Sequence, residues 1–326
     1  MHFHIKTLSS SFLLIFCFFS LNSYQIFIIP KCEVFFIVLF FFSIMFWARD
    51  SAGGEWVEWI ADAEIVYATN DNINNGMIGP AEESEQVVTP SLLLGRIYQI
   101  TDFSRLFLTA NFSKGFHHNF DDLDFTDIGI TTTLRHKLGI GLFKPWVGTS
   151  VTYTDINSKS RIREGHRYAI GLSVGKRIHE RIDIHAAYAY DNRNSIDSEP
   201  AIPPLPGNVY DLKGHKVSAG ANIVALENAL VSFNYSYRDG DTASSCKAEF
   251  IPFPIVQAIT VDDGFPKGEF CAYRMESTKS FYAANLSYSF LNGHASANLG
   301  YEHIVGKAKD FEYRSNIIIF GINYSY

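Results

Sequence analysis

The stretch Gly321-Ile322-Asn323-Tyr324-Ser325-Tyr326 decides the fold of this chain. Apolar or aromatic side chains alternate with polar or small ones, and the apolar stripe continues back through Phe320 to Ile318. A period of two residues is that of a β-strand with one apolar face. Tyrosine rings gather where a membrane meets water. The segment therefore predicts a strand that crosses a membrane and whose last side chains lie at the lipid interface.

The composition agrees with a membrane protein built from strands. Of 326 residues, 47% are hydrophobic and 15% are aromatic, yet the mean hydropathy is only +0.02. Alternating apolar and polar residues cancel in such an average, whereas membrane-spanning helices would raise it. The net charge of −7 gives no indication of a nucleic-acid partner.

The same alternation recurs along the chain in blocks of ten or more residues that are separated by turn residues. Apolar stripes with aromatic ends favour a membrane barrel over the alternative, a soluble β-sandwich. The predicted strands are, roughly, 56–70, 87–100, 104–116, 125–137, 144–156, 164–177, 181–193, 212–225, 228–240, 278–291, 294–306 and 311–326.

Short and long connections alternate between these segments. The sequence therefore predicts an all-β fold, a closed antiparallel up-and-down transmembrane β-barrel of about 12 strands, with 56–71 paired to 310–326. An even number of strands returns both chain ends to the same side of the membrane. Closure leaves no strand edge facing lipid.

The C-terminal stretch also resembles the assembly signal of outer-membrane β-barrel proteins in Gram-negative bacteria, in Gly321, Tyr324 and Tyr326. The resemblance covers residues 55–326, at the level of architecture and of the C-terminal signal, and points to no particular characterised family. It implies a bacterial outer-membrane location with both termini in the periplasm. The implied partners are outer-membrane lipid, lipopolysaccharide and the outer-membrane assembly machinery.

Residues 1–52 differ from the rest of the chain. They contain two apolar runs, Phe12–Phe19 and Val34–Trp47, and the small residues of 51–53 follow the second run. The second run suits the apolar region of a signal peptide. We therefore expect a cleaved signal peptide plus an upstream extension from a start codon placed too early, with the barrel domain over 53–326. The alternative is an N-terminal hairpin anchor.

The inward faces of the predicted strands carry small, mostly neutral polar residues, which predicts a lumen that is not filled by side chains. The residues expected to line it are Asn111, Thr131, Thr133, Arg135, Ser150, Thr152, Asp183, His185, Asn222, Asn234, Asn285, Asn298 and Glu302.

The longest loop, 241–277, contains Cys246 and Cys271, and we expect a disulfide between them because the compartment is oxidising. The loop also carries the apolar run Phe250–Val256. This run either packs over the barrel mouth or forms a plug or a binding surface. Asp262 and Asp263 of the same loop, together with Asp121, Asp122 and Asp124, are expected to attract cations to the mouth.

These features favour a porin-like channel for small polar solutes, restricted by the disulfide-clamped loop. One alternative is an outer-membrane enzyme that acts on lipid or peptide at the extracellular rim. Another is a non-conducting barrel for surface contact or assembly. We expect no catalytic residues, metal or cofactor. The residues with side chains suited to catalysis or metal binding are Asp183 with His185, Asp211 with His215, His117 with His118, and Asp121, Asp122 and Asp124.

Overall fold

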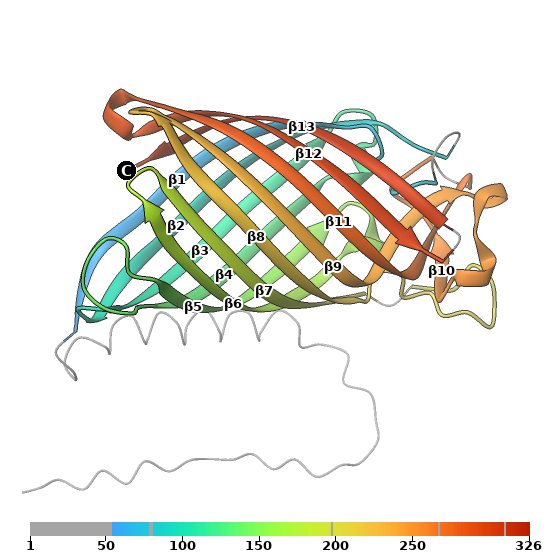
Figure 1. Ribbon diagram of the computed structural model, residues 1–326. Helices are drawn as coiled ribbons and strands as arrows, with labels where there is room; N and C mark the ends of the chain where they lie inside the picture. The colour runs from blue at the N-terminus through green and yellow to red at the C-terminus, as the bar shows by residue number, and fades with distance from the viewer. Residues whose placement is uncertain (1–53, 78–80, 197, 267, 310) are drawn as a thin grey trace, which may run out of the picture. The chain divides into compact units, whose positions relative to one another are not determined.

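The structure is a computed structural model that describes residues 54–326 except 78–80, 197, 267 and 310. Its strands form a closed antiparallel barrel in which sequential strands are neighbours (Figure 1). The strands are β1 (Glu55–Asn70), β2 (Glu85–Thr101), β3 (Ser104–His117), β4 (Phe125–Lys137), β5 (Trp146–Ser158), β6 (Gly165–His179), β7 (Ile182–Ser195), β8 (Leu212–Leu226), β9 (Ala229–Lys247), β10 (Ala258–Val261), β11 (Phe270–Phe290), β12 (Ala295–Ala308) and β13 (Phe311–Ser325).

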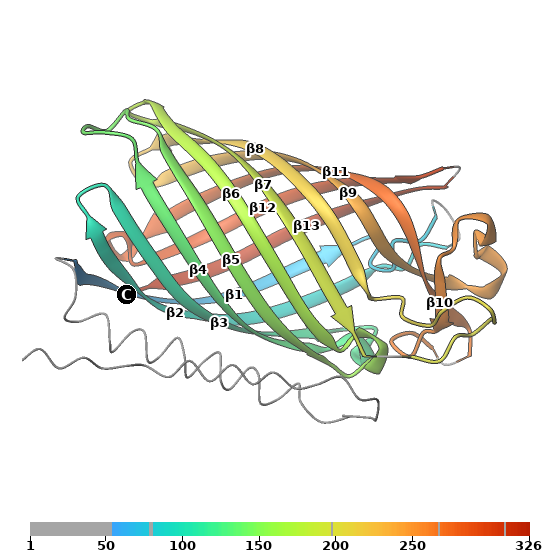
Figure 2. The same ribbon diagram turned by 90° about the horizontal axis from the view of Figure 1, so that it is seen from below.

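The all-β up-and-down barrel is confirmed, and its wall is made by every strand except the short β10. The ring closes between β1 and β13, with a continuous register from Asp62 opposite Ser325 to Asn70 opposite Ile317. The backbone N–H of Tyr326 donates to Ala61 O at 2.9 Å. Figure 2 shows the end of β13 beside β1. The predicted pairing of the first and last strands is therefore correct.

Short turns gather at one end of the barrel, the turn end, and long connections gather at the other, the loop end (Figure 1). The turns include 102–103, 180–181 and 227–228, each of two residues between paired strands, and the 3₁₀ turn η5 (Leu291–Gly293). At the loop end lie the other 3₁₀ turns, η1 (Asp121–Leu123), η2 (Arg161–Arg163), η3 (Ala248–Phe250) and η4 (Phe253–Ile255).

Two strands extend beyond their predicted ends. β9 and β11 continue past the wall as a paired ribbon that reaches from Gly240 opposite Ser277 to Lys247 opposite Phe270. β10, which the sequence did not predict, pairs with β11 on this ribbon. The sequence predicted an earlier end for these strands, because polar and small residues such as Gly240 and Asp241 are typical of a turn.

The buried apolar core lies at the loop end, in a cap formed by the described residues of 196–211 and 241–277. Ile259 and Tyr273 of the cap pack with Tyr313 and Phe311 of β13. Smaller clusters join the cap to η1 through Leu123 and to η2 through Ile162. Ile251 and Val256 of the apolar run are buried in the first of these clusters, whereas Phe253 is exposed, so the run packs mainly within the cap.

The predicted signal segment, residues 1–52, lies outside the described residues, as does residue 53. In the part of the chain that is described, no helix is long and apolar enough to cross a membrane.

Tyr326 lies at the closing seam with 87% of its surface exposed, so it contributes little packing to the folded barrel. We expect Tyr326→Asp to lower the amount of protein inserted in the outer membrane, because it places a charge in the aromatic girdle and removes the end of the predicted assembly signal. Heat-modifiable barrel in outer-membrane fractions is the measurement, with Tyr326→Phe as the control. Equal amounts of the two variants would contradict the prediction.

Candidate functional site

The predicted lining residues lie at alternating strand positions, on the face opposite the exposed apolar side chains such as Ile170 and Phe233. In the middle of the barrel they are cross-strand neighbours. Thr131 is opposite Thr152, and their hydroxyl oxygens are 3.0 Å apart. Asn285 is opposite both Ser232 and Gly300. These short side chains leave space between the walls of the barrel.

None of the predicted lining residues is buried, and Arg135, Asn234 and Asn285 are exposed. An inward-facing polar side chain in a packed barrel would be covered by the opposite wall. The exposure therefore indicates that solvent reaches the inward face at mid-barrel.

The lining is not mostly neutral, contrary to the sequence interpretation. Toward the loop end, the inward face carries a run of cations here called the basic row. Within it, Arg167 is directly opposite Arg193, and Arg238 is directly opposite both Lys216 and Lys279. These residues were not among the predicted lining residues, because each predicted stripe ended before the strand did. Continuing the same alternation toward the loops would have found them.

A second group of cations lies at the turn end. Arg105 is directly opposite Arg135, and Arg177 binds Asp183 through hydrogen bonds of 2.9 and 3.0 Å. These residues line a cavity of about 370 Å³, the turn-end cavity. Asp183, a predicted lining residue, therefore lies at this mouth and is paired there.

A cavity of about 420 Å³, the upper cavity, lies where the lumen meets the loops. Arg163 of η2 and Leu123 of η1 contribute to it, together with inward-facing residues of β4 to β8. Its lining residues are Leu123, Phe125, Asp127, Ile156, Ser158, Arg163, Arg167, Asp191, Arg193 and Leu212.

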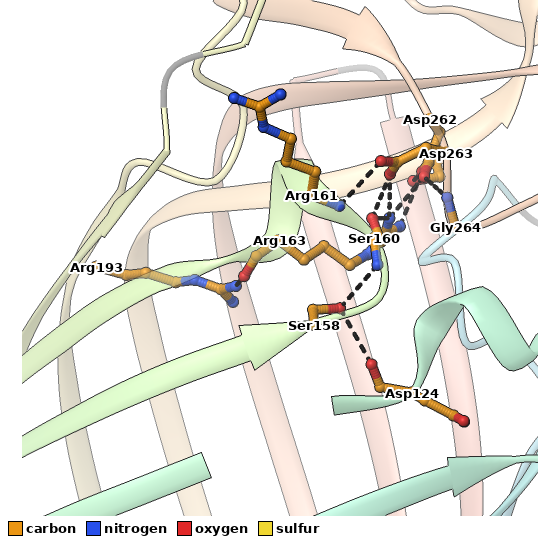
Figure 3. A network of polar contacts seen from close by, with 10 residues as sticks. Asp124, Ser158, Ser160, Arg161, Arg163, Arg193, Asp262, Asp263 and Gly264 are labelled. Atoms are coloured by element: carbon orange, nitrogen blue, oxygen red, sulfur yellow. Dashed lines mark hydrogen bonds and ion pairs between the residues drawn. The ribbon is translucent and has the colours of Figure 1, made fainter. Parts of the chain in front are cut away.

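A buried ion pair, the latch, joins the cap to the β5–β6 loop (Figure 3). Arg163 donates from Nη1 and Nη2 to the two carboxylate oxygens of Asp262, at 2.6 and 2.8 Å. Asp262 also accepts from Gly264 N at 2.9 Å and from the Ser245 hydroxyl. Next to it, Asp263 accepts from the Ser160 hydroxyl and from Arg161 N.

The latch holds both of its members in the charged form. Burial by itself would raise the pKa of Asp262, but the Arg163 charge and the hydrogen bonds from Arg163, Ser245 and Gly264 outweigh it and lower this pKa. Burial would likewise lower the pKa of Arg163, but Tyr210, Asp262 and Asp263 outweigh it and raise this pKa.

Asp262 therefore does not attract cations to the mouth, contrary to the expectation, because its side chain is 0% exposed and bound to Arg163. Asp124 is also paired, to Lys159 Nζ at 2.8 Å. Asp121 lies 3.7 Å from the same ammonium nitrogen.

Cys246 and Cys271 occupy directly opposite positions on the ribbon of β9 and β11. Both thiols are free in this structure, and the predicted disulfide is not formed. Burial raises the pKa of the Cys246 thiol to about 12. Their bonding therefore remains a prediction, although the register brings the two residues together.

The candidate catalytic residues of the sequence do not bring a nucleophile together with a base and an acid. Asp211 accepts from Ser195, whereas His215 contacts the Tyr188 hydroxyl at 2.7 Å. Ser104 contacts His136 at 2.8 Å. Within the described residues, no carboxylate forms an ion pair with His136 or His215, and no cluster of three His, Cys, Asp or Glu side chains could hold a metal ion.

His117 and His118 do not act together in the structure. His117 lies 3.6 Å from Asp124 and stands edge-on to Phe125. The backbone of His118 instead donates to the Glu85 carboxylate at 3.1 Å. Asp122 takes part in η1, whose first turn is acidic.

Comparison with known proteins finds no matching family model and no matching curated protein. Among solved structures, the chain is similar to an outer membrane channel from Pseudomonas putida F1, with a TM-score of 0.50, 12% identity, and 85% of this chain and 99% of that chain covered. It also matches the channel DcaP of Acinetobacter baumannii, with a TM-score of 0.42, 8% identity, and coverage of 84% and 98%. At these identities the first match shows the fold alone, which is that of an outer-membrane β-barrel.

Loss of the latch should open the cap. Arg163→Gln or Asp262→Asn leaves a buried charge without its partner, at a cost of ~3–5 kcal/mol. We expect faster cleavage of 248–266 by proteinase K, with the heat-modifiable barrel retained. Arg161→Gln is the control, because only the Arg161 backbone contacts the network and its guanidinium points away (Figure 3).

Acid should open the wild-type cap in the same assay. The folded pKa of Asp262 is lowered, so the latch contributes fully above the unfolded aspartate pKa of about 4 and is lost as the pH falls through the folded value. Cleavage of both latch variants at the wild-type rate would contradict this account of the cap.

Proposed function

We propose that this protein is a channel of the outer membrane for small solutes. The observation that supports it best is the inward face at mid-barrel, where polar side chains such as Thr131, Asn234 and Asn285 are short and not buried. Water and small polar molecules can replace one another along such a surface at little cost. Cavities continue this path at the turn end and beneath the cap.

We further propose that the turn end and both chain termini face the periplasm. Outer-membrane barrels place tight turns on the periplasmic side and long loops outside. Most connections here follow that division, apart from 138–145 at the turn end and 309–310 at the loop end. In this orientation the cap covers the extracellular mouth.

The cap would restrict passage, because the apolar cluster around Ile259 and Tyr273 is buried and packed at the loop end. A disulfide would join the two strands of the ribbon, β9 and β11, that carry the cap. Directly opposite residues of antiparallel strands have Cα atoms about 4.5–5.5 Å apart, which lies within the range of disulfides. The register of Cys246 and Cys271 meets that requirement.

An enzyme receives less support. Hydrolases need a nucleophile that contacts its base, and the serine–histidine contact found here, between Ser104 and His136, involves no acid within the described residues. The basic row and the cavities are features of a lining rather than of a catalytic centre.

In a planar bilayer, we expect the purified protein to give small ohmic steps, and deletion of 250–265 to give larger ones, because the deletion removes much of the packed cap. The matched control replaces residues 250–265 with a glycine–serine segment of the same length. Absence of conductance from both the wild type and the deletion variant would reject the channel.

Protein isolated from the outer membrane should contain a Cys246–Cys271 bond, detected by mass mapping of a non-reduced digest. Reduction should speed proteolysis of the cap, since the bond closes a loop of more than 20 residues and would contribute about 3 kcal/mol in the chain-entropy model. The Cys246→Ser/Cys271→Ser variant controls for effects of the reductant elsewhere. Two free thiols in the isolated protein would contradict the clamp.

A further inference from the structure

The basic row is unfavourable for the barrel by itself. Like charges at directly opposite positions destabilise a sheet, and they occur here between Arg167 and Arg193 and again from Lys216 through Arg238 to Lys279. A lumen with low-dielectric walls weakens screening by solvent and makes this repulsion larger than on an open surface. Placing an anion beside the row would reverse the sign of the interaction.

The protein itself neutralises little of this charge. Arg238 binds Asp191 at 3.3 Å. Within the described residues, the other members of the row form no ion pair within 4.0 Å. Lys216 and Arg193 instead lie over aromatic rings, at 5.0 Å from Phe281 and 5.1 Å from Tyr210. Aromatic faces hold these cations in place without cancelling their charge.

The upper cavity lies against this row and offers a second kind of surface. Arg167 and Arg193 supply its positive side, whereas Phe125, Ile156 and Leu212 supply an apolar side. Nε of Arg193 is buried and, among the described residues, has no hydrogen-bond partner. Buried polar atoms are normally paired, so the unpaired Nε is an exception in a residue that lines a cavity of about 420 Å³ and whose Nη2 donates to Arg163 O.

The other carboxylates of the lumen lie mainly on different strands. Asp62 and Glu64 are inward-facing residues of β1, and Glu302 lies on β12. Asp127, which lines the upper cavity, has a buried carboxylate oxygen without a hydrogen-bond partner in the described residues. The positive side of the lumen is thus concentrated on β6 to β9 and β11.

We propose that the upper cavity and the basic row bind a small organic anion, a carboxylate on a compact apolar body. The carboxylate contacts Arg167 and Arg193, and the apolar body lies against Phe125, Ile156 and Leu212. Arginine suits this task because its planar donors match a carboxylate in two hydrogen bonds. The cations Arg105 and Arg135 at the turn end continue the path. Transport of this anion rests on the proposed channel function, whereas its binding does not.

Binding is tested by titration calorimetry on the detergent-solubilised full-length protein, with benzoate as the probe. We expect Arg167→Gln and Arg193→Gln each to weaken benzoate binding about tenfold or more, the loss typical of a charged hydrogen-bond or ion-pair partner in a confined site. Arg161→Gln is the matched control, because Arg161 is exposed on η2 outside the lumen, and it should bind like the wild type. Benzyl alcohol, the neutral analogue, should bind at least about tenfold more weakly than benzoate.

Equal losses in Arg161→Gln and Arg167→Gln, or no benzoate binding by the wild type, would overturn the site. Inorganic phosphate binding as tightly as benzoate would overturn the apolar half of the proposal. These results stand apart from conduction.

Conduction tests selectivity separately, through the reversal potential of the 250–265 deletion variant in a gradient of KCl. We expect anion preference, reduced when Arg167→Gln and Lys216→Gln are added. Cation preference together with absent benzoate binding would reject the anion site and leave the channel. Benzoate binding without any conductance would reject the channel and leave the site.

Discussion

The backbone hydrogen bonds between β1 and β13 are the constraint on which the rest of the structure depends. A strand edge in lipid would leave a row of unpaired amide and carbonyl groups, each costing several kcal/mol. The last strand must therefore pair with the first. It does so along a continuous register, from the pair Asp62 and Ser325 to the pair Asn70 and Ile317. Closure fixes which residues face the lumen, because the period of two carries the same inward and outward assignment around the ring.

Closure also decides where the apolar core lies. The outer wall must present its apolar side chains to lipid, so exposed residues such as Ile318 and Phe320 are satisfied by the membrane rather than by the protein. Packing within the protein is concentrated at the cap, around Ile259, Tyr273 and Tyr313. The cap is consequently a small core of its own, joined to the neighbouring loop by the Arg163–Asp262 latch.

The barrel interior combines surfaces with different roles. Its middle is lined mostly by short polar side chains, while cations face one another near both ends, as in Arg105 with Arg135 and Arg167 with Arg193. The full chain is acidic, with a net charge of −7, so the cations inside do not follow from the average composition. Their cross-strand positions concentrate a positive field where water is confined, which is how a lining selects charge.

The sequence by itself determined the class of fold, the strand number and the seam, because alternation and turn residues are local and the terminal aromatics mark the lipid interface. It also placed Thr131, Asn285 and the other lining residues on one face, since every second residue of a strand points to the same side of the sheet. Only the tertiary structure decided the pairing of Arg163 with Asp262 and the opposition of Cys246 and Cys271. The first depends on how two loops distant in sequence meet, and the second depends on the register of β9 with β11. The basic row is an intermediate case. The alternation of the sequence assigns its residues to the inward face, whereas only the cross-strand register brings their charges together.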